Sequence, residues 1–116
     1  MTIRLLTLVL PLLLGACAAT MAPPAERLAT AEAAARGAKE LGAEKDPKAA
    51  LHLKLAQEQI DQARTLMKEE QNVRADHVLQ RAHADAELSL ALAKEATVND
   101  ETAKAKEKLK AVKGGK

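Results

Sequence analysis

The sequence contains no phenylalanine, tyrosine or tryptophan. Aromatic side chains bury the most surface per residue, so any core must be built from smaller groups. Their absence also removes the stacking platforms with which proteins hold single-stranded nucleic acid. The formal net charge is only +2, so the strong basic field that attracts nucleic acid is missing as well. We therefore expect an elongated, thin-cored body and no nucleic-acid partner.

Cysteine, glycine and proline are also scarce. The single cysteine, Cys17, cannot form an intrachain disulfide. Five glycines and four prolines leave long stretches without a helix breaker. Alanine, leucine, glutamate and lysine fill these stretches, and all are strong helix formers. The composition predicts an all-α fold.

The first 17 residues are organised like a secretory signal. Arg4 precedes an apolar run over residues 5–14, which is shorter than the roughly 20 residues that a membrane-spanning helix needs. The run ends in Leu14-Gly15-Ala16-Cys17, which resembles the lipobox of bacterial lipoproteins. The resemblance implies a signal peptide over 1–16, cleavage between Ala16 and Cys17, and acylation of Cys17. An ordinary signal peptide with a chance cysteine and an unprocessed membrane anchor are the alternatives.

Lipidation implies a place in the cell. Two or more acyl chains hold a protein stably on a membrane, whereas one chain binds reversibly. In lipoproteins an aspartate directly after the cysteine favours the inner membrane, and Ala18 stands there instead. We therefore expect a protein anchored in the outer membrane and facing the periplasm. Residues 17–23 would form the lipidated tether.

Residues 24–97 are expected to form a helical domain, with helices at about 24–41, 47–70 and 73–96. Gly42 suits a helix end, and Asp46-Pro47 is a strong helix start. Apolar residues recur every three or four positions, which indicates heptad seams of alanine and leucine. The expected seam residues are Leu28, Ala31, Ala35 and Ala38, then Ala49, Leu53, Ala56, Ile60, Ala63 and Met67, then Ala75, Leu79, Ala82, Ala86, Ser89, Ala93 and Ala96. Leu51, Leu55 and Leu66 would widen the second seam, and Val78, Leu88 and Leu92 would flank the third.

The segment Glu69-Glu70-Gln71-Asn72 is polar but contains no glycine or proline. The flanking helices have matched lengths, so we expect an antiparallel hairpin within an elongated hairpin or three-helix bundle, with Asn72 as the cap. One continuous helix that pairs with a second chain is the alternative. This alternative implies a homo-oligomer.

The segment Val98-Asn99-Asp100-Glu101 is expected to break the third helix. A basic tail over 98–116 would follow, with a short, frayed helix from Ala103 to Lys113. Residues 103–116 of this tail contain the lysines Lys104, Lys106, Lys108, Lys110, Lys113 and Lys116, against one acid, Glu107. Alternating lysines spread around a helix instead of forming one stripe. We expect this tail to contact the cell wall or another anionic surface, with a solvated tail as the alternative.

Residues suited to catalysis or metal binding are few. His77 and His83 are six apart, which differs from the i, i+4 spacing of helical zinc sites. His52 is expected on another helix and at the wrong end to join them. Asp85 and Glu87, like Glu69 and Glu70, are interpreted as solvated carboxylates. The sequence predicts no catalytic residue, no metal site and no cofactor.

Two stretches carry a family resemblance: residues 46–60, from Asp46-Pro47-Lys48 to Gln59-Ile60, and residues 72–88, which include Arg81-Ala82-His83-Ala84-Asp85. They resemble the family of domains of unknown function DUF4398, small helical domains of bacterial envelope lipoproteins. The family implies a place and a fold but no activity. We thus expect a structural or protein-interaction role in the envelope. The alternative is a peptidoglycan tether, through the basic tail or a covalent bond at Lys116, because murein lipoproteins also end in a coupled lysine.

Overall fold

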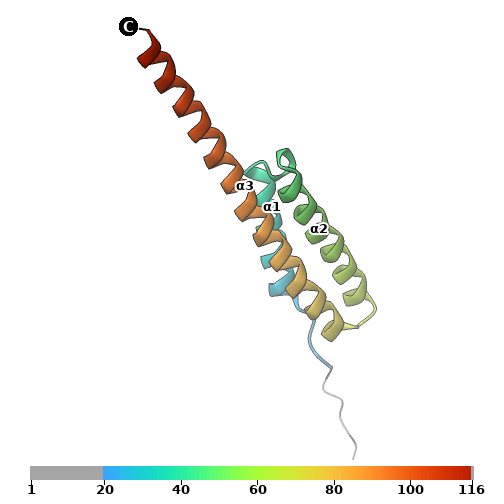
Figure 1. Ribbon diagram of the computed structural model, residues 1–116. Coiled ribbons are helices and arrows are strands. Elements are labelled where there is room, and N and C mark those ends of the chain that lie inside the picture. The colour runs from blue at the N-terminus through green and yellow to red at the C-terminus, as the bar shows by residue number, and fades with distance from the viewer. Residues whose placement is uncertain (1–19, 116) are drawn as a thin grey trace, which may run out of the picture.

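The computed structural model describes residues 20–115, so Cys17 and Lys116 lie outside the described residues. The elements are α1 (Ala25–Glu40), a 3₁₀ turn η1 (Ala43–Lys45), α2 (Pro47–Lys68) and α3 (Asn72–Gly114). The three helices run up, down and up, and each packs against the other two (Figure 1). Residues 20–115 contain no strand. The predicted all-α fold and the hairpin between the second and third helices are therefore confirmed.

The first connection follows the sequence signals. α1 ends before Gly42, whose φ of 81° lies in the left-handed region that glycine tolerates best. Asp46 then caps α2, because its Oδ1 accepts a hydrogen bond from the backbone N–H of Ala49 at 2.8 Å. Pro47 occupies the first helical position, where its missing N–H costs nothing. The expected starts and ends of the first two helices agree with the structure to within two residues.

The α2–α3 turn is closed by backbone hydrogen bonds without a glycine. The N–H of Gln71 donates to the carbonyl of Leu66 at 2.8 Å, and that of Glu70 donates to Met67 at 3.1 Å. This pattern resembles a Schellman motif, with Glu70 in the left-handed position at a φ of 59°. Asn72 is the first residue of α3 and not its side-chain cap. Its Nδ2 instead donates to the carbonyl of Met21 at 2.7 Å.

The core is an alanine and leucine seam that runs the length of the bundle. The buried apolar residues are Ala31, Ala35, Ala38, Ala43, Ala49, Leu53, Ala56, Ile60, Ala63, Leu66, Ala75, Val78, Leu79, Ala82, Ala86 and Ala93. Ser89 is buried among them and donates its hydroxyl to the carbonyl of Ala49 at 2.7 Å. The small side chains let the three backbones approach closely. Most predicted seam positions are confirmed, but Leu66 takes the buried place expected for Met67, and Leu51 and Leu88 are exposed.

The predicted break at residues 98–101 is wrong, because α3 continues as one helix to Gly114. Asn and Asp inside a helix cost only about 0.7 kcal/mol each relative to Ala. The carboxylate of Asp100 offsets part of that cost by accepting a hydrogen bond from Lys104 at 2.6 Å, one turn later. Alanine, lysine and glutamate then favour helix on their own. The basic tail is therefore the end of α3 and not a separate helix.

The last part of α3 extends beyond the bundle (Figure 1). Ala93 and Thr97 still lie beside Leu41 and Lys45 of the first connection. From Glu101 onward every described residue is exposed. We call residues 101–114 the overhang. At 1.5 Å per residue it projects about 21 Å, and the whole of α3 measures about 64 Å.

Candidate functional site

The N-terminal segment leaves the bundle at the end opposite the overhang (Figure 1). The hydrogen bond from Asn72 to Met21 holds this segment against the start of α3, and Pro24 is buried just before α1 begins. The predicted lipidation site, Cys17, lies outside the described residues, so its acylation stays a prediction. The described chain nevertheless emerges toward Cys17 beside the α2–α3 turn.

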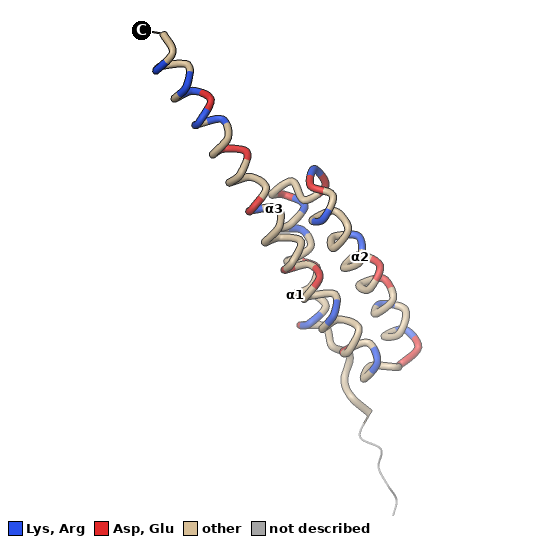
Figure 2. The backbone as a smooth tube through the Cα atoms, viewed as in Figure 1, with Lys and Arg blue, Asp and Glu red and all other residues tan. Residues whose placement is uncertain are grey.

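The overhang carries most of the predicted contact residues (Figure 2). Because the helix advances about 100° per residue, Lys104 and Lys108 lie on one side. Lys106, Lys110 and Lys113 lie on roughly the opposite side. The predicted spread of lysines around the helix is therefore confirmed. Lys116 lies outside the described residues.

Among the overhang lysines of the described chain, only Lys104 forms an ion pair. Its hydrogen bond to Asp100 raises the pKa of the Lys104 ammonium. Lys106, Lys108, Lys110 and Lys113 point into solvent with no ion pair within residues 20–115. Four cations at the tip of a projecting helix can meet an extended anionic surface, but they form no enclosed pocket.

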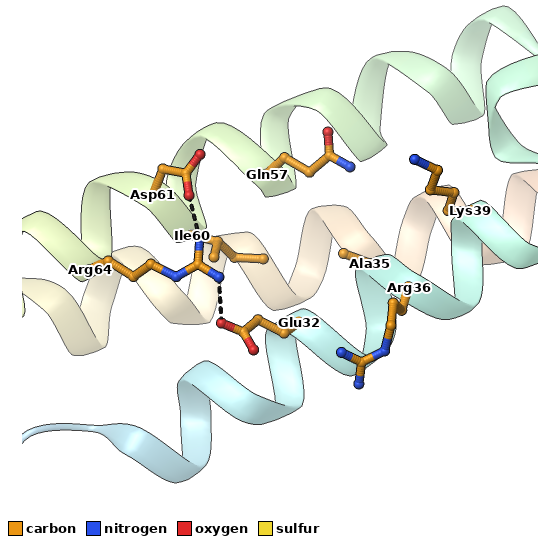
Figure 3. A pocket seen from close by; sticks show the side chains of 8 residues that line it. All are labelled: Glu32, Ala35, Arg36, Lys39, Gln57, Ile60, Asp61 and Arg64. Atoms are coloured by element: carbon orange, nitrogen blue, oxygen red, sulfur yellow. Dashed lines mark hydrogen bonds and ion pairs between the residues drawn. The ribbon is translucent and has the colours of Figure 1, made fainter.

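A second feature is an open groove of about 380 Å³ between α1 and α2 (Figure 3). Arg64 crosses it and donates hydrogen bonds to Glu32 of α1, at 2.8 Å, and to Asp61 of α2. The bond to Glu32 raises the pKa of the Arg64 guanidinium. Both carboxylates are thus occupied by one arginine that joins two helices. The three side chains are better explained as an ion-pair link between α1 and α2 than as an acid–base site.

The three histidines do not gather. His52 instead pairs with Asp85 across the α2–α3 hairpin, with 2.8 Å between Nδ1 and Oδ1. Gln59 donates to the other oxygen of Asp85 at 2.7 Å. The interpretation of Asp85 as a solvated carboxylate is therefore wrong, since its side chain is only 22% exposed. The hairpin explains the pairing, because positions 52 and 85 lie at nearly equal distances from the turn.

The remaining predicted polar residues stay apart. Glu69, Glu70 and Glu87 are exposed, as expected. Nε2 of His83 approaches Glu87 at 3.7 Å, which is a contact along one helix. Within residues 20–115 no group of three or more His, Cys, Asp or Glu is placed to hold a metal ion. In the same part of the chain, none of the helices combines the length and hydropathy needed to cross a membrane.

The fold is a small three-helix bundle in which α3 extends beyond α1 and α2 (Figure 1). The family model described as "Domain of unknown function (DUF4398)" matches residues 26–105. The chain therefore belongs to this family, which confirms the resemblance seen in residues 46–60 and 72–88. The match spans the whole bundle and the first residues of the overhang. No curated protein and no solved structure matches the chain.

Proposed function

We propose that this protein is a lipoprotein of the bacterial outer membrane, anchored through acylated Cys17 and facing the periplasm. Its role would be structural or one of protein interaction, without catalysis. The observation that supports this most is the placement of its two ends. The chain leaves toward Cys17 at the α2–α3 turn, and the overhang projects at the other end of α3. A helix about 64 Å long separates them.

The bundle then acts as a spacer. It keeps the lysines of the overhang away from the anchored end and exposes them to a partner in the envelope. The side chains of Arg64 and Asp85 are engaged between helices, which suits this role. Crosslinking in intact cells followed by mass spectrometry would identify the partner protein.

Intact-mass measurement of the chain purified from the envelope tests the anchor. We expect residues 17–116 plus the mass of the lipid. Cys17→Ser should abolish both the lipid and the cleavage. Thr20→Ser, a small change three residues downstream, is the control and should leave the processed form unchanged. A chain that retains residues 1–16, or that carries a free thiol at Cys17, would contradict the proposal.

A peptidoglycan tether is the second candidate, favoured by the four overhang lysines without an ion pair within residues 20–115. The peptide stems of peptidoglycan carry carboxylates, which such lysines can attract. Purified sacculi should retain the chain at low salt and release it at high salt, because salt screens exposed charges. Changing Lys106, Lys108, Lys110 and Lys113 to Gln should abolish retention. The same change at Lys45, Lys48, Lys68 and Lys94, which are exposed on the bundle, is the control.

A covalent tether through Lys116 gives a different result. A covalent bond would survive boiling of the sacculi in detergent, and deletion of Lys116 would release the chain. Retention that survives boiling but ignores this deletion would contradict attachment at Lys116. A protein partner alone predicts no binding to purified sacculi at any salt concentration.

A further inference from the structure

α3 carries a second heptad seam on the face that points away from the bundle. Its residues recur at alternating spacings of four and three: Ala84, Leu88, Ala91, Glu95, Val98, Thr102, Ala105, Leu109 and Val112. All of them are exposed. Val98, Leu109 and Val112 are 58%, 55% and 75% exposed, respectively. We call Val98, Thr102, Ala105, Leu109 and Val112 the outer seam.

The outer seam begins where the buried seam ends. Along the buried face, the repeat of four and three continues past Ala93 and Ala96 through Asp100, Ala103 and Glu107. All three are exposed, because α1 and α2 do not extend alongside this part of α3 (Figure 1). On the opposite face the apolar residues continue through the overhang. A 3.5-residue repeat of this kind is the pattern with which one helix packs along another.

Charge is unevenly distributed on the two flanks of the outer seam. Glu101 lies on a flank toward the start of the seam, and Lys106, Lys108 and Lys113 lie on the flanks toward its end, whereas Glu107 is on the opposite side of the helix. A copy laid alongside in the opposite direction would place the basic end of each helix against the acidic start of the other. A copy laid in the same direction would place basic end against basic end.

We propose that the outer seam pairs with the outer seam of a second copy of this chain as a short antiparallel coiled coil. In the register that the charges favour, Val98 packs against Leu109 of the second copy, and Thr102 packs against Ala105. Glu101 on the flank then meets Lys108 of the second copy, twice by symmetry. This inference does not depend on lipidation of Cys17.

The opposite orientation fits less well. In a parallel pair the flanking contacts would be Glu101 with Lys106 and Lys108 with Lys113. The second contact joins like charges, which is destabilising. Within residues 20–115 the overhang has no packing partner, so a second helix along the outer seam would add the burial that it lacks. The outer seam contributes few layers, so we expect a weak dimer of the size found in transient complexes.

Sedimentation equilibrium of the full chain over a range of concentrations, up to roughly 1 mM, tests the pairing. Lys108→Glu should weaken the dimer about tenfold, because two attractive contacts become repulsive. Glu101→Lys should weaken it similarly, and the double variant should restore it. Lys110→Glu carries the same charge change outside the seam and is the matched control. All variants share residues 1–19, so a difference in dimer stability among them cannot arise from association through the apolar run 5–14.

The antiparallel and parallel orientations predict opposite effects of Lys108→Glu on the stability of the dimer. In a parallel pair Lys108→Glu would create an attraction to Lys113 and strengthen the dimer, and that result would overturn the proposal. A chain that stays monomeric throughout the concentration range would overturn it as well. Carbodiimide coupling of mixed ¹⁴N- and ¹⁵N-labelled chains gives an independent check. It should join Glu101 of one isotope to Lys108 of the other, and a join to Lys106 instead would also contradict the antiparallel register.

Discussion

The two halves of α3 share one continuous backbone, yet different forces hold them. Between Ala75 and Ala93 the helix buries an alanine and leucine seam against α1 and α2. From Glu101 to Gly114 every residue of the described chain is exposed. Packing therefore stabilises the first half, and only local helix propensity and an occasional ion pair such as Asp100–Lys104 stabilise the second. One helix can thus contain both a structural core and an exposed arm.

Hydrogen exchange should show the largest difference between the two halves. Amides near Leu79 and Ala86 open only when the bundle unfolds, which costs several kcal/mol in a domain of this size. Amides in the overhang open by local fraying. In dilute solution we expect the overhang to exchange about a thousandfold faster or more. Equal exchange rates in the two halves would contradict the division, and NMR or mass spectrometry can measure both.

Truncation of leucine should separate the halves next. Leu79 is fully buried, so Leu79→Ala should lower the free energy of unfolding by about 3 kcal/mol through lost contacts and a residual cavity. Leu109→Ala, the same change in the overhang, should alter it by less than about 0.5 kcal/mol in dilute solution. Urea unfolding followed by circular dichroism measures both. A similar loss for the two variants would show that the overhang packs as the bundle does.

Enlargement of alanine tests the close approach of the helices. Ala82 is fully buried between them, so Ala82→Leu should destabilise the bundle by about 1–3 kcal/mol through overpacking. Ala111 is exposed, and Ala111→Leu should leave the unfolding transition nearly unchanged. If Ala82→Leu were tolerated equally well, the seam would have to contain unfilled space. Thermal melts of the two variants under identical conditions make the comparison.

Acid titration should give the smallest difference. The hydrogen bond from Arg27, at 2.5 Å, lowers the pKa of the Asp76 carboxyl. A depressed pKa stabilises the fold above the unfolded value, near 3.9, and this stabilisation is lost as the pH falls through the folded value. Asp76→Asn should therefore make the loss of stability below about pH 4 shallower. Asp100→Asn, in the pair at the base of the overhang, should leave the unfolding of the bundle unchanged, and urea unfolding at several pH values would reveal a departure from either result.

The sequence was most informative where a repeating physical constraint acts. Buried residues on packed helices must recur every three or four positions, so Leu53, Ile60, Leu79 and Ala86 could be identified directly. The sequence did not show that Leu66 is buried more fully than Met67, because this depends on which side of α2 faces the other helices in its last turn. Helix breaks are also hard to predict when neither glycine nor proline is present. Asn99 and Asp100 resemble the cap of a new helix, but the residues around them have high helix propensity, so α3 continues without a break.

Polar pairs between helices depended on knowing the hairpin first. His52 and Asp85 are 33 positions apart, and nothing local connects them. Once the turn is placed near residue 69, His52 and Asp85 are seen to lie at nearly the same distance from it, and therefore side by side in the hairpin. The outer seam shows the converse situation. Its periodicity is readable in the sequence, but only the position of the bundle reveals that Val98, Leu109 and Val112 are left uncovered.

The up–down–up order of the helices has a mechanical consequence. α1 begins at the end where the N-terminal segment leaves, and α3 finishes at the far tip, so these two contacting helices run in the same direction. A pull applied between the two ends of the described chain therefore slides α1 along α3 in shear, instead of unzipping them one contact at a time. Resistance is then shared along their whole common length. The route of the chain suits a link that bears load.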